Sequence, residues 1–324
     1  WMDRRGVFRF SAAFMVVIIA VGLFYDHTRG LPARLPGSVA RVAEVALEKP
    51  AHRKRCEGIE AADIDMERLC RVNVLQVEPS FLLWGDSHAM MSMTAVGEAA
   101  ARTGRNGVIA ATNGCAPLLN VYRAGRGGAD CGAVNDAVLE MIASKPELGT
   151  VLLVARWARH AEGTPYGNES GATLYLTDAK RVASDASENR LLFAEALRQT
   201  VQALVGLERR VVLLGAIPEV GEEVPNQLAK MKWRGRTHEL SLPYVQFVQR
   251  QAAVQQAMAA AQQQAGVRFY PVAPNLCSGI SCALVSSDGM PLYFDDNHLS
   301  RIGLQRVQPL FDEIFQSLTP ALKN

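Results

Sequence analysis

The sequence predicts an α/β domain with a parallel sheet, preceded by one membrane-spanning helix. Two observations lead to this fold class. Apolar segments of strand length alternate with segments of helix composition from about residue 80 onward. One long apolar run, with arginines at its N-terminal end, opens the chain. The 324 residues leave room for one large α/β domain and a smaller additional part.

The apolar run covers residues 7–25 and is interrupted by Arg9 and the small polar Ser11. At about 1.5 Å per residue it just crosses a bilayer core of about 30 Å. Because Arg4 and Arg5 precede it, the positive-inside rule places the N-terminus in the cytoplasm and the rest of the chain outside. A cleaved signal peptide and a buried helix are the alternatives, but no clear small-residue cleavage site follows the run.

These features divide the chain into a membrane helix at 1–28, a linker at 29–55 and a folded domain at 56–324. Three prolines interrupt the linker around an expected helix at 39–48. The chain begins Trp1-Met2, which is not a native start. We therefore expect the membrane helix to be the last one of a longer membrane domain.

Within the domain, strand and helix patterns alternate. The expected strands are residues 80–84, 107–111, 150–155, 210–215 and 267–271. The expected helices are residues 89–102, 133–144, 188–204, 245–264 and 301–318. Two polar excursions, 163–184 and 219–243, follow two of the strands. Because open α/β sheets bind ligands beyond the carboxyl ends of their strands, these excursions are expected either to wall a substrate site or to be surface decoration.

Composition and charge are ordinary. The net charge is +2 and charged residues make up 20%, so nothing indicates a nucleic-acid partner. Six cysteines fall into three sequence-local pairs, which suits disulfides formed in an oxidising compartment; six unrelated thiols are the alternative. The expected pairs are Cys56–Cys70, Cys115–Cys131 and Cys277–Cys282. There is no Cys-x-x-Cys pair, so no metal site is expected.

The chemistry centres on a strand that ends abruptly in Gly85-Asp86-Ser87. A serine at the start of a helix lies where backbone N–H groups and the helix dipole stabilise a developing negative charge. It still needs a base, and His298 is the candidate. Asp295, three residues before that histidine, would orient its ring.

Three neighbouring residues are assigned other roles. Asp86 is expected to form the turn, since aspartate hydrogen-bonds its own backbone in such turns. His88 is expected to be structural. Asp296 is the second candidate for the acid that orients His298.

The two motifs together resemble the SGNH (GDSL-like) hydrolase superfamily. Four segments are similar to the extracytoplasmic SGNH domain attached to acyltransferase family 3 membrane proteins: Leu83-Trp84-Gly85-Asp86-Ser87-His88-Ala89, Ala155-Arg156-Trp157, Ile217-Pro218-Glu219-Val220-Gly221 and Tyr293-Phe294-Asp295-Asp296-Asn297-His298-Leu299-Ser300. The resemblance runs from about Cys56 to the C-terminus. It implies a flavodoxin-like, three-layer α/β/α fold and a Ser87-His298-Asp295 triad.

The resemblance also implies an oxyanion hole. Related hydrolases use the backbone N–H of the nucleophile, here Ser87, a glycine after the second strand, which Gly114 matches, and an asparagine after the third. The third strand instead runs into Arg156 and Trp157. Either Asn113 or a backbone donor replaces the missing amide, or Arg156 and Trp157 shape the site differently.

Two tryptophans are candidates for contact with a sugar ring. Trp157 offers an aromatic face, although core packing is the favoured explanation for this residue. Trp233, between Lys232 and Arg234, is the better candidate for glycan contact, since we expect it in a loop.

The implied function is O-acylation, usually O-acetylation, of a cell-surface polysaccharide hydroxyl such as one in a lipopolysaccharide O-antigen. A membrane acyltransferase domain, upstream in the same chain or a partner, would supply acetyl groups derived from acetyl-CoA, with no cofactor bound to the SGNH domain itself. The domain would lie in the periplasm, tethered to the bacterial inner membrane. A membrane-anchored esterase that deacylates glycans or lipids is the alternative. A non-catalytic glycan-binding module is a second alternative, against which the intact Ser87, Asp295 and His298 argue.

Overall fold

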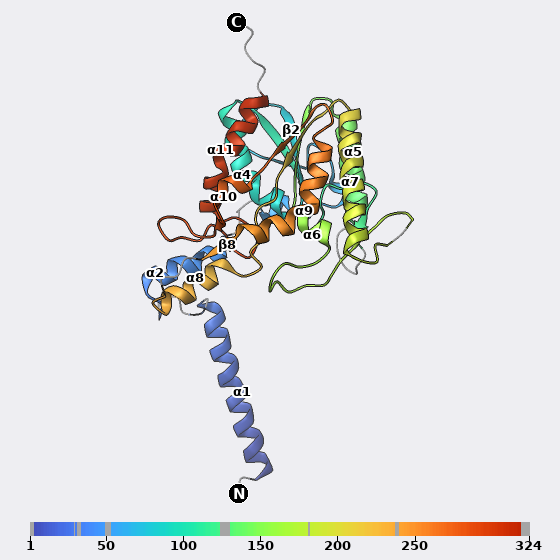
Figure 1. Ribbon diagram of the computed structural model, residues 1–324. Helices are drawn as coiled ribbons and strands as arrows, with labels where there is room; N and C mark the ends of the chain where they lie inside the picture. The colour runs from blue at the N-terminus through green and yellow to red at the C-terminus, as the bar shows by residue number, and fades with distance from the viewer. Residues whose placement is uncertain are drawn as a thin grey trace.

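The computed structural model describes residues 3–28, 30, 34–48, 53–123, 130–180, 182–236 and 240–318. Parts of the segments expected from the sequence lie outside the described residues. They are the chain ends at 1–2 and 319–324, the linker positions 29, 31–33 and 49–52, and positions 181 and 237–239 of the two excursions. The domain is a six-stranded sheet between two layers of helices (Figure 1).

The sheet has the order β1-β3-β2-β5-β7-β9. Its strands are β1 (Cys70–Arg71), β2 (Pro79–Gly85), β3 (Asn106–Ala111), β5 (Thr150–Val154), β7 (Arg210–Leu214) and β9 (Val267–Tyr270). Each of the five expected strands is confirmed to within one residue at either end. These five are parallel, and the short β1 is antiparallel to β3 at one edge. If the five parallel strands are numbered along the chain from one to five, they lie in the flavodoxin-like order 2-1-3-4-5. The strand order reverses beside the first of them, β2.

Strand β2 shows why the sheet is covered on both sides. Phe81 and Leu83 pack into one core cluster, whereas Leu82 and Trp84 pack into the other. All four side chains are buried. Because successive residues of a strand face opposite sides, an uninterrupted apolar strand requires a helix layer on each face.

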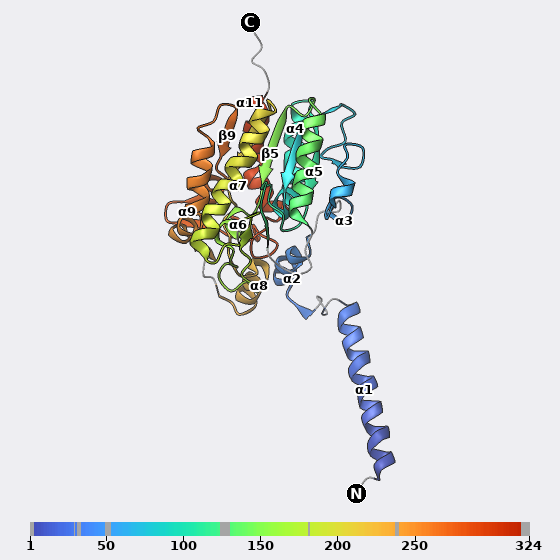
Figure 2. The ribbon, with the colours of Figure 1, turned by 90° about the vertical axis from the view of Figure 1, so that its right-hand side faces the viewer.

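The two helix layers contain the helices that the sequence predicts. Helices α4 (Ser87–Arg102) and α11 (Arg301–Leu318) cover one face, and α5 (Cys131–Ser144), α7 (Ala186–Gly206) and α9 (Tyr244–Ala261) cover the other (Figure 2). The expected helices are confirmed, with ends that differ by no more than three residues. The short elements are α3 (Arg53–Cys56), η3 (Ala61–Asp63), α10 (Ala273–Leu276), β4 (Tyr122–Arg123), β6 (Leu176–Thr177), β8 (Ser241–Pro243), β10 (Cys277–Ser278) and β11 (Ser281–Ala283).

Two further helices lie near the carboxyl ends of the strands. Helix α6 (Trp157–Glu162) follows β5, and α8 (Val224–Trp233) occupies part of the excursion after β7. Neither helix is among those expected from the sequence. Helix α8 forms because Val224, Leu228 and Ala229 lie on one face and are buried there.

The linker docks on that buried face. Helix α2 (Gly37–Glu44) packs Val39 and Val42 against Leu228 and Ala229 of α8. The 3-10 turn η2 (Val45–Leu47) continues it and buries Val45 against Met91 and Phe294. The helix expected at 39–48 is therefore present, and it belongs structurally to the domain surface.

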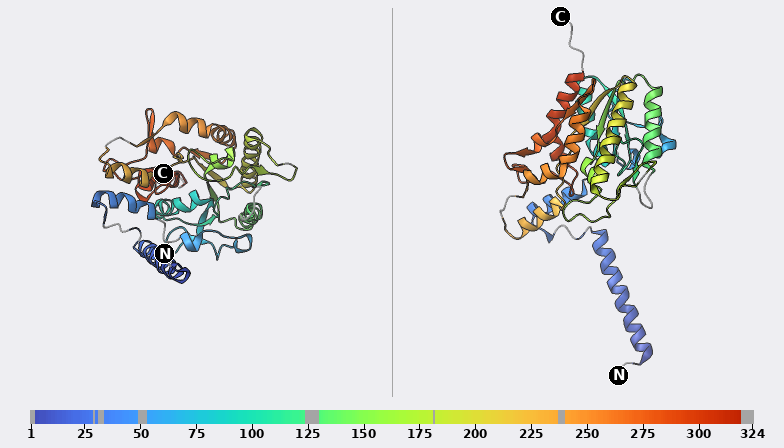
Figure 3. Two further views of the ribbon diagram at one scale, coloured as in Figure 1. Left: turned by 90° about the horizontal axis from the view of Figure 1, so that it is seen from below. Right: turned by 45° about the vertical axis from the view of Figure 1, so that its right-hand side comes forward.

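Helix α1 (Arg4–His27) extends away from the domain on the side where α2 and α8 lie (Figures 1 and 3). None of its 24 residues is buried. In the described part of the chain it is the one helix that is long and apolar enough to cross a membrane.

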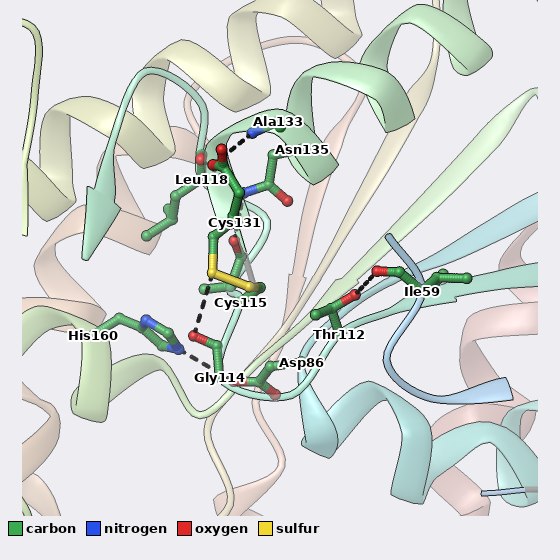
Figure 4. The surroundings of a disulfide bond; sticks show 12 residues. Ile59, Asp86, Thr112, Gly114, Cys115, Leu118, Cys131, Ala133, Asn135 and His160 are labelled. Carbon is green, nitrogen blue, oxygen red and sulfur yellow. Dashed lines mark hydrogen bonds and ion pairs between the residues drawn. A yellow bond between two sulfur atoms is a disulfide. The ribbon is translucent and has the colours of Figure 1, made fainter. Parts of the chain in front are cut away.

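All three expected disulfides are present. Cys56–Cys70 joins α3 to β1, and Cys277–Cys282 joins β10 to β11. Cys115–Cys131 ties the loop after β3 to the first residue of α5 (Figure 4). Small loops next to the sheet are thereby held in place by covalent bonds.

Candidate active site

Ser87 is the first residue of α4, immediately after the turn that ends β2. Gly85 allows this turn to form, because a Cβ at that position would lie 1.7 Å from the carbonyl oxygen of Val154 on β5. Asp86 has an extended backbone and caps α4, accepting a hydrogen bond from the His88 N–H at 2.8 Å. The sequence therefore holds Ser87 at a helix N-terminus on the carboxyl edge of the sheet.

Ser87, His298 and Asp295 form one chain of hydrogen bonds. Ser87 Oγ lies 2.8 Å from His298 Nε2, and His298 Nδ1 lies 2.7 Å from Asp295 Oδ2. The second carboxylate oxygen of Asp295 accepts the N–H groups of Asn297 (2.9 Å) and His298 (2.7 Å). Burial alone raises the pKa of Asp295, but the bonds from His298 and from these N–H groups hold that pKa below its usual value. An ionised Asp295 accepts the Nδ1 proton, which leaves Nε2 to accept from the serine hydroxyl.

Two rings pack against His298. The Phe294 ring stacks nearly parallel to it, with centroids 5.4 Å apart and an interplanar angle of 6°. The His88 ring lies 4.7 Å away between centroids. His88 is buried, and burial, to which the neighbouring His298 adds, lowers the pKa of His88 to about 4. His88 is therefore neutral at pH 7, and it donates from Nε2 to Asn297 Oδ1 at 2.9 Å.

Asp86 organises the turn as expected and does more than cap the helix. Its side chain is 2% exposed. Oδ2 accepts the Arg156 N–H at 2.9 Å and lies 3.3 Å from Nε2 of His160, which Figure 4 shows beside it. Burial raises the pKa of Asp86, but the His160 hydrogen bond and the neighbouring histidines outweigh it and hold the pKa well below the ordinary range. The sequence analysis missed His160, since no local spacing connects it to Asp86, 74 residues earlier.

Asp296 makes no hydrogen bond to His298 in the described part of the chain. Its Oδ1 accepts the side-chain amide of Asn297 at 2.7 Å. Its carbonyl oxygen accepts the N–H groups of Val220 (2.8 Å) and Gly221 (3.2 Å). The structure therefore pairs His298 with Asp295 and not with the second candidate from the sequence.

Arg156 occupies the position where related hydrolases carry an asparagine, and its side chain is engaged in ion pairs. Its two terminal nitrogens each lie 2.7 Å from a carboxylate oxygen of Glu169. Its Nε bonds Glu219, which also accepts from Arg250 Nε at 2.7 Å. These bonds to Glu169 and Glu219 raise the pKa of Arg156 despite burial, which opposes the rise. Arg156 thus fastens the two excursions to the end of β5.

Trp157 lies in the core. Its side chain is 0% exposed, its indole N–H donates to the Leu214 carbonyl at 2.8 Å, and its ring packs edge-on against Phe193. Of the two interpretations that the sequence left open, core packing is confirmed and the sugar-contacting face is not, because a side chain on the first turn of helix α6 points back onto the sheet.

The remaining predicted residues lie at the margin of the triad or beyond it. Thr112 N–H donates to the Gly85 carbonyl at 3.2 Å, which holds the loop containing Asn113 and Gly114 beside the nucleophile turn. Gly114 has a φ of 69°, in the left-handed region that favours glycine, and Asn113 is exposed. Trp233, 66% exposed, ends α8 rather than lying in a loop.

The triad lies at the end of the domain from which α1 departs. Helix α11 begins at Arg301, three residues after His298, and runs to the opposite end, where the C-terminus is marked in Figure 1. Across the described ranges, no three His, Cys, Asp or Glu side chains are grouped so that they could hold a metal ion.

This geometry can be compared with that of known proteins. A search of curated proteins gave no match. Among solved structures, the periplasmic domain of a lipopolysaccharide acetyltransferase from Salmonella ser. Paratyphi A is similar, with 14% identity over 85% of this chain and 99% of that one and a TM-score of 0.56. A GDSL-like lipase from Bacteroides thetaiotaomicron has 10% identity over 85% of this chain and 95% of that one, with a TM-score of 0.41. Because the sequence identity is low, the similarity to the Salmonella domain supports the fold alone.

The family comparison covers most of the domain. The model described as "SGNH domain (fused to AT3 domains)" matches residues 55–313, where AT3 denotes acyltransferase family 3. This match spans the strand–turn–helix with Ser87 and the segment with Asp295 and His298. Because it covers well over half of the chain, the chain belongs to the family of SGNH domains that are fused to AT3 domains.

Proposed function

We propose that this domain transfers an acyl group, in the first place acetyl, to a hydroxyl group of a cell-surface glycan, with Ser87, His298 and Asp295 as the catalytic residues. The observation that carries the proposal is the continuous chain of hydrogen bonds from Ser87 Oγ through His298 to Asp295, at 2.8 and 2.7 Å. These distances are those required of a nucleophile, its base and the group that orients the base. Membership of a family fused to acyltransferase domains supports acyl transfer as the reaction class.

In the first half-reaction, Ser87 Oγ attacks the acyl carbonyl carbon of the donor while His298 Nε2 takes the hydroxyl proton. The tetrahedral intermediate collapses, the donor's leaving group departs with the proton from His298, and an acyl ester on Ser87 remains. Asp295 stabilises the transient imidazolium and keeps its Nδ1–H pointed at the carboxylate.

In the second half-reaction, a sugar hydroxyl attacks the ester carbonyl as His298 removes its proton. Ser87 then leaves as the alcohol, reprotonated by His298, and the acyl group is on the sugar. If water replaces the sugar hydroxyl, the same steps amount to ester hydrolysis. The acceptor therefore decides between the transferase and the esterase.

The oxyanion of both intermediates would be stabilised by the backbone N–H groups of Ser87 and Gly114. Ser87 N–H lies in the first turn of α4, where the helix dipole is favourable. Gly114 belongs to the loop that Thr112 holds against Gly85. Asn113 is the candidate for a third donor, because the Arg156 side chain is occupied by Glu169 and Glu219.

For the location, we propose that α1 lies in the bacterial inner membrane with its N-terminus in the cytoplasm, and that the domain lies in the periplasm. Three disulfides and the arginines before the apolar run agree with this arrangement. The donor acetyl group would originate from acetyl-CoA and reach Ser87 through a membrane acyltransferase domain, either upstream in the same chain or a partner. The structural relative from Salmonella, the periplasmic domain of a lipopolysaccharide acetyltransferase, has the same kind of location.

The test uses the full chain in detergent with p-nitrophenyl acetate as donor, with and without surface oligosaccharides as acceptors. Release of p-nitrophenol and the mass of the glycan are followed together. Ser87→Ala is expected to lower release at least about a thousandfold. Ser184→Ala, which removes an exposed serine near the start of another helix, α7, is the control and should leave release unchanged.

Ser87-dependent gain of acetyl mass on the glycan would support the transferase. Ser87-dependent release that no glycan alters would favour the esterase. Equal release from the wild type and Ser87→Ala would contradict the triad and return the glycan-binding module to consideration.

A further inference from the structure

A polar groove of about 570 Å³ lies beside the triad. Asp296, one of its lining residues, follows directly after Asp295. The first residue of α8, Val224, donates its N–H to the Asp295 carbonyl at 3.3 Å. The wall of the groove and the catalytic segment are therefore held together by backbone hydrogen bonds.

The groove carries an excess of negative charge. Glu169, Glu222, Glu223 and Asp296 line it, against one cation, Lys230. Glu169 is neutralised by Arg156. In the part of the chain that the structure describes, no ion pair involves the other three carboxylates. Glu222 instead accepts from neutral side-chain amides, that of Asn168 at 2.8 Å and that of Gln227.

Asp296 presents an acceptor that lacks a donor. Its Oδ2 is buried and has no hydrogen-bond partner among the described residues. Burial, followed by the nearby charge of Asp295, raises the pKa of both Asp296 and Glu223. A ligand that carries a carboxylate would add repulsion to the negative charges of this groove, whereas a ligand that carries only hydroxyl groups would not.

Helix α8 extends the surface away from the triad. Asn226, Lys230 and Trp233 are spaced at i, i+4 and i+7, so they share one face, and all three are exposed. The opposite face of α8 is buried against α2. The ten residues of the helix span about 15 Å. Trp233 at its end offers a ring on which the apolar face of a sugar can stack.

We propose that this groove, with the exposed face of α8, binds the acceptor glycan and selects uncharged sugar units over units that carry a carboxylate. The inference rests on the proposed function and specifies its substrate class. Hydroxyl groups of a neutral sugar donate to the carboxylates and amides of the groove. A uronic acid meets the unpaired charges of Glu222, Glu223 and Asp296.

The experiment compares methyl glucoside with methyl glucuronide, two acceptors that differ in one charged group. The full chain in detergent is acylated from p-nitrophenyl acetate at low salt, and transfer to each sugar is measured by mass against acetate released to water. We expect transfer to methyl glucoside to be at least about tenfold faster. Repulsion between two like unit charges about 6 Å apart in water slows transfer roughly threefold, and each carboxylate of the groove adds such a factor.

Glu222→Gln and Glu223→Gln should each lower the ratio of transfer to methyl glucoside over transfer to methyl glucuronide by about threefold. In 1 M salt this ratio should fall further, because the salt screens the charges. Glu313→Gln is the matched control, because it removes an exposed carboxylate from α11, outside the groove. Trp233→Ala should reduce transfer to both sugars by a similar factor through a higher acceptor KM.

Equal transfer to both sugars by the wild type would overturn the inference, as would a preference that the two glutamate variants do not change. Ser87-dependent acetate release without transfer to either sugar would also overturn it. Absence of any Ser87-dependent release would instead overturn the proposed function, so the two failures are distinguishable.

Discussion

At the scale of single residues, the Asp86 carboxylate holds the nucleophile turn together. It accepts the N–H groups of His88 and Arg156 and lies 3.3 Å from a ring nitrogen of His160. These donors come from α4, from the end of β5 and from α6, so one buried charge connects three elements. Its loss should therefore be felt in stability as well as in the position of Ser87.

We predict that Asp86→Asn lowers the free energy of unfolding at pH 7 by about 2–3 kcal/mol, the range for a hydrogen-bonded buried charge. Because the folded-state pKa of Asp86 lies well below the ordinary 3.8, its contribution is present above that value and is lost as the pH falls below it. Urea unfolding at pH 7 and pH 3 checks this. A difference between wild type and variant that does not shrink in acid would contradict the prediction.

His88 should make folding sensitive to mild acid. Its folded-state pKa is about 4, against an ordinary value of 6.5, so below pH 6.5 the unfolded chain binds a proton that the folded chain does not. The neutral ring therefore makes its full contribution to the free energy of unfolding above pH 6.5. As the pH falls from 6.5 to 4, this contribution decreases by up to about 1.4 kcal/mol per pH unit. His88→Gln, which keeps a donor for Asn297, should remove this part of the slope between pH 6.5 and 5 in urea titrations. An unchanged slope would show that His88 does not titrate on unfolding in this range.

At the scale of elements, α4 contains a glycine that the helix pattern alone does not explain. A Cβ on Gly97 would lie 2.1 Å from the carbonyl oxygen of Val72, so the helix packs directly on the backbone that follows β1. Asn73 strengthens this contact by donating to the Gly97 carbonyl at 3.1 Å. Glycine is therefore required here by close approach rather than by its φ angle.

Gly97→Ala should destabilise the protein by about 1–2 kcal/mol, although alanine is the better helix former by about 1 kcal/mol. Gly206→Ala is the matched control, because Gly206 ends α7 with no atom within 4 Å of the added Cβ. Thermal unfolding should show a lower Tm for the first variant and an unchanged or higher Tm for the second. Equal effects of the two substitutions would contradict the packing argument.

At the scale of the whole molecule, the two N-terminal helices stand in different relations to the domain. Helix α1 buries nothing, whereas α2 and the following turn bury Val39, Val42 and Val45. Val45 contacts Phe294, whose ring stacks on His298. The docked segment thus supports the active site, and the apolar helix does not.

We predict that a chain beginning at residue 34 keeps the Tm of the full chain and no longer needs detergent. A chain beginning at residue 53 should lose at least about 2 kcal/mol of stability, because burial of one valine contributes about 1.5–3 kcal/mol. It should also hydrolyse p-nitrophenyl acetate more slowly, because Phe294, which stacks on His298, loses its contact with Val45. Similar melting of the two truncated chains would show that α2 docks without stabilising the domain.

The local signals in the sequence were sufficient for the sheet, its helices, the disulfide pairs and the serine–histidine–aspartate set. The strands are apolar on both faces and short, and the cysteine partners are close in sequence. Ser87, Asp295 and His298 belong to short motifs that indicate their chemistry through the resemblance to the SGNH superfamily. Trp157 shows the limit of such patterns, because a motif identifies a residue without saying which way its side chain points.

The tertiary structure alone decided the contacts between distant segments. Two partners of Asp86, Arg156 and His160, are 70 and 74 residues away, and Arg156 meets Glu219 across 63 residues. Helix α8 depends on burial against α2, and its acidic groove exists because Glu169, Glu222 and Asp296 converge from three parts of the chain. Hydrophobic periodicity and turn chemistry act within a few residues and so determine the elements. Charges and polar groups are selected by whichever segment the fold places opposite them, and no local spacing records that choice.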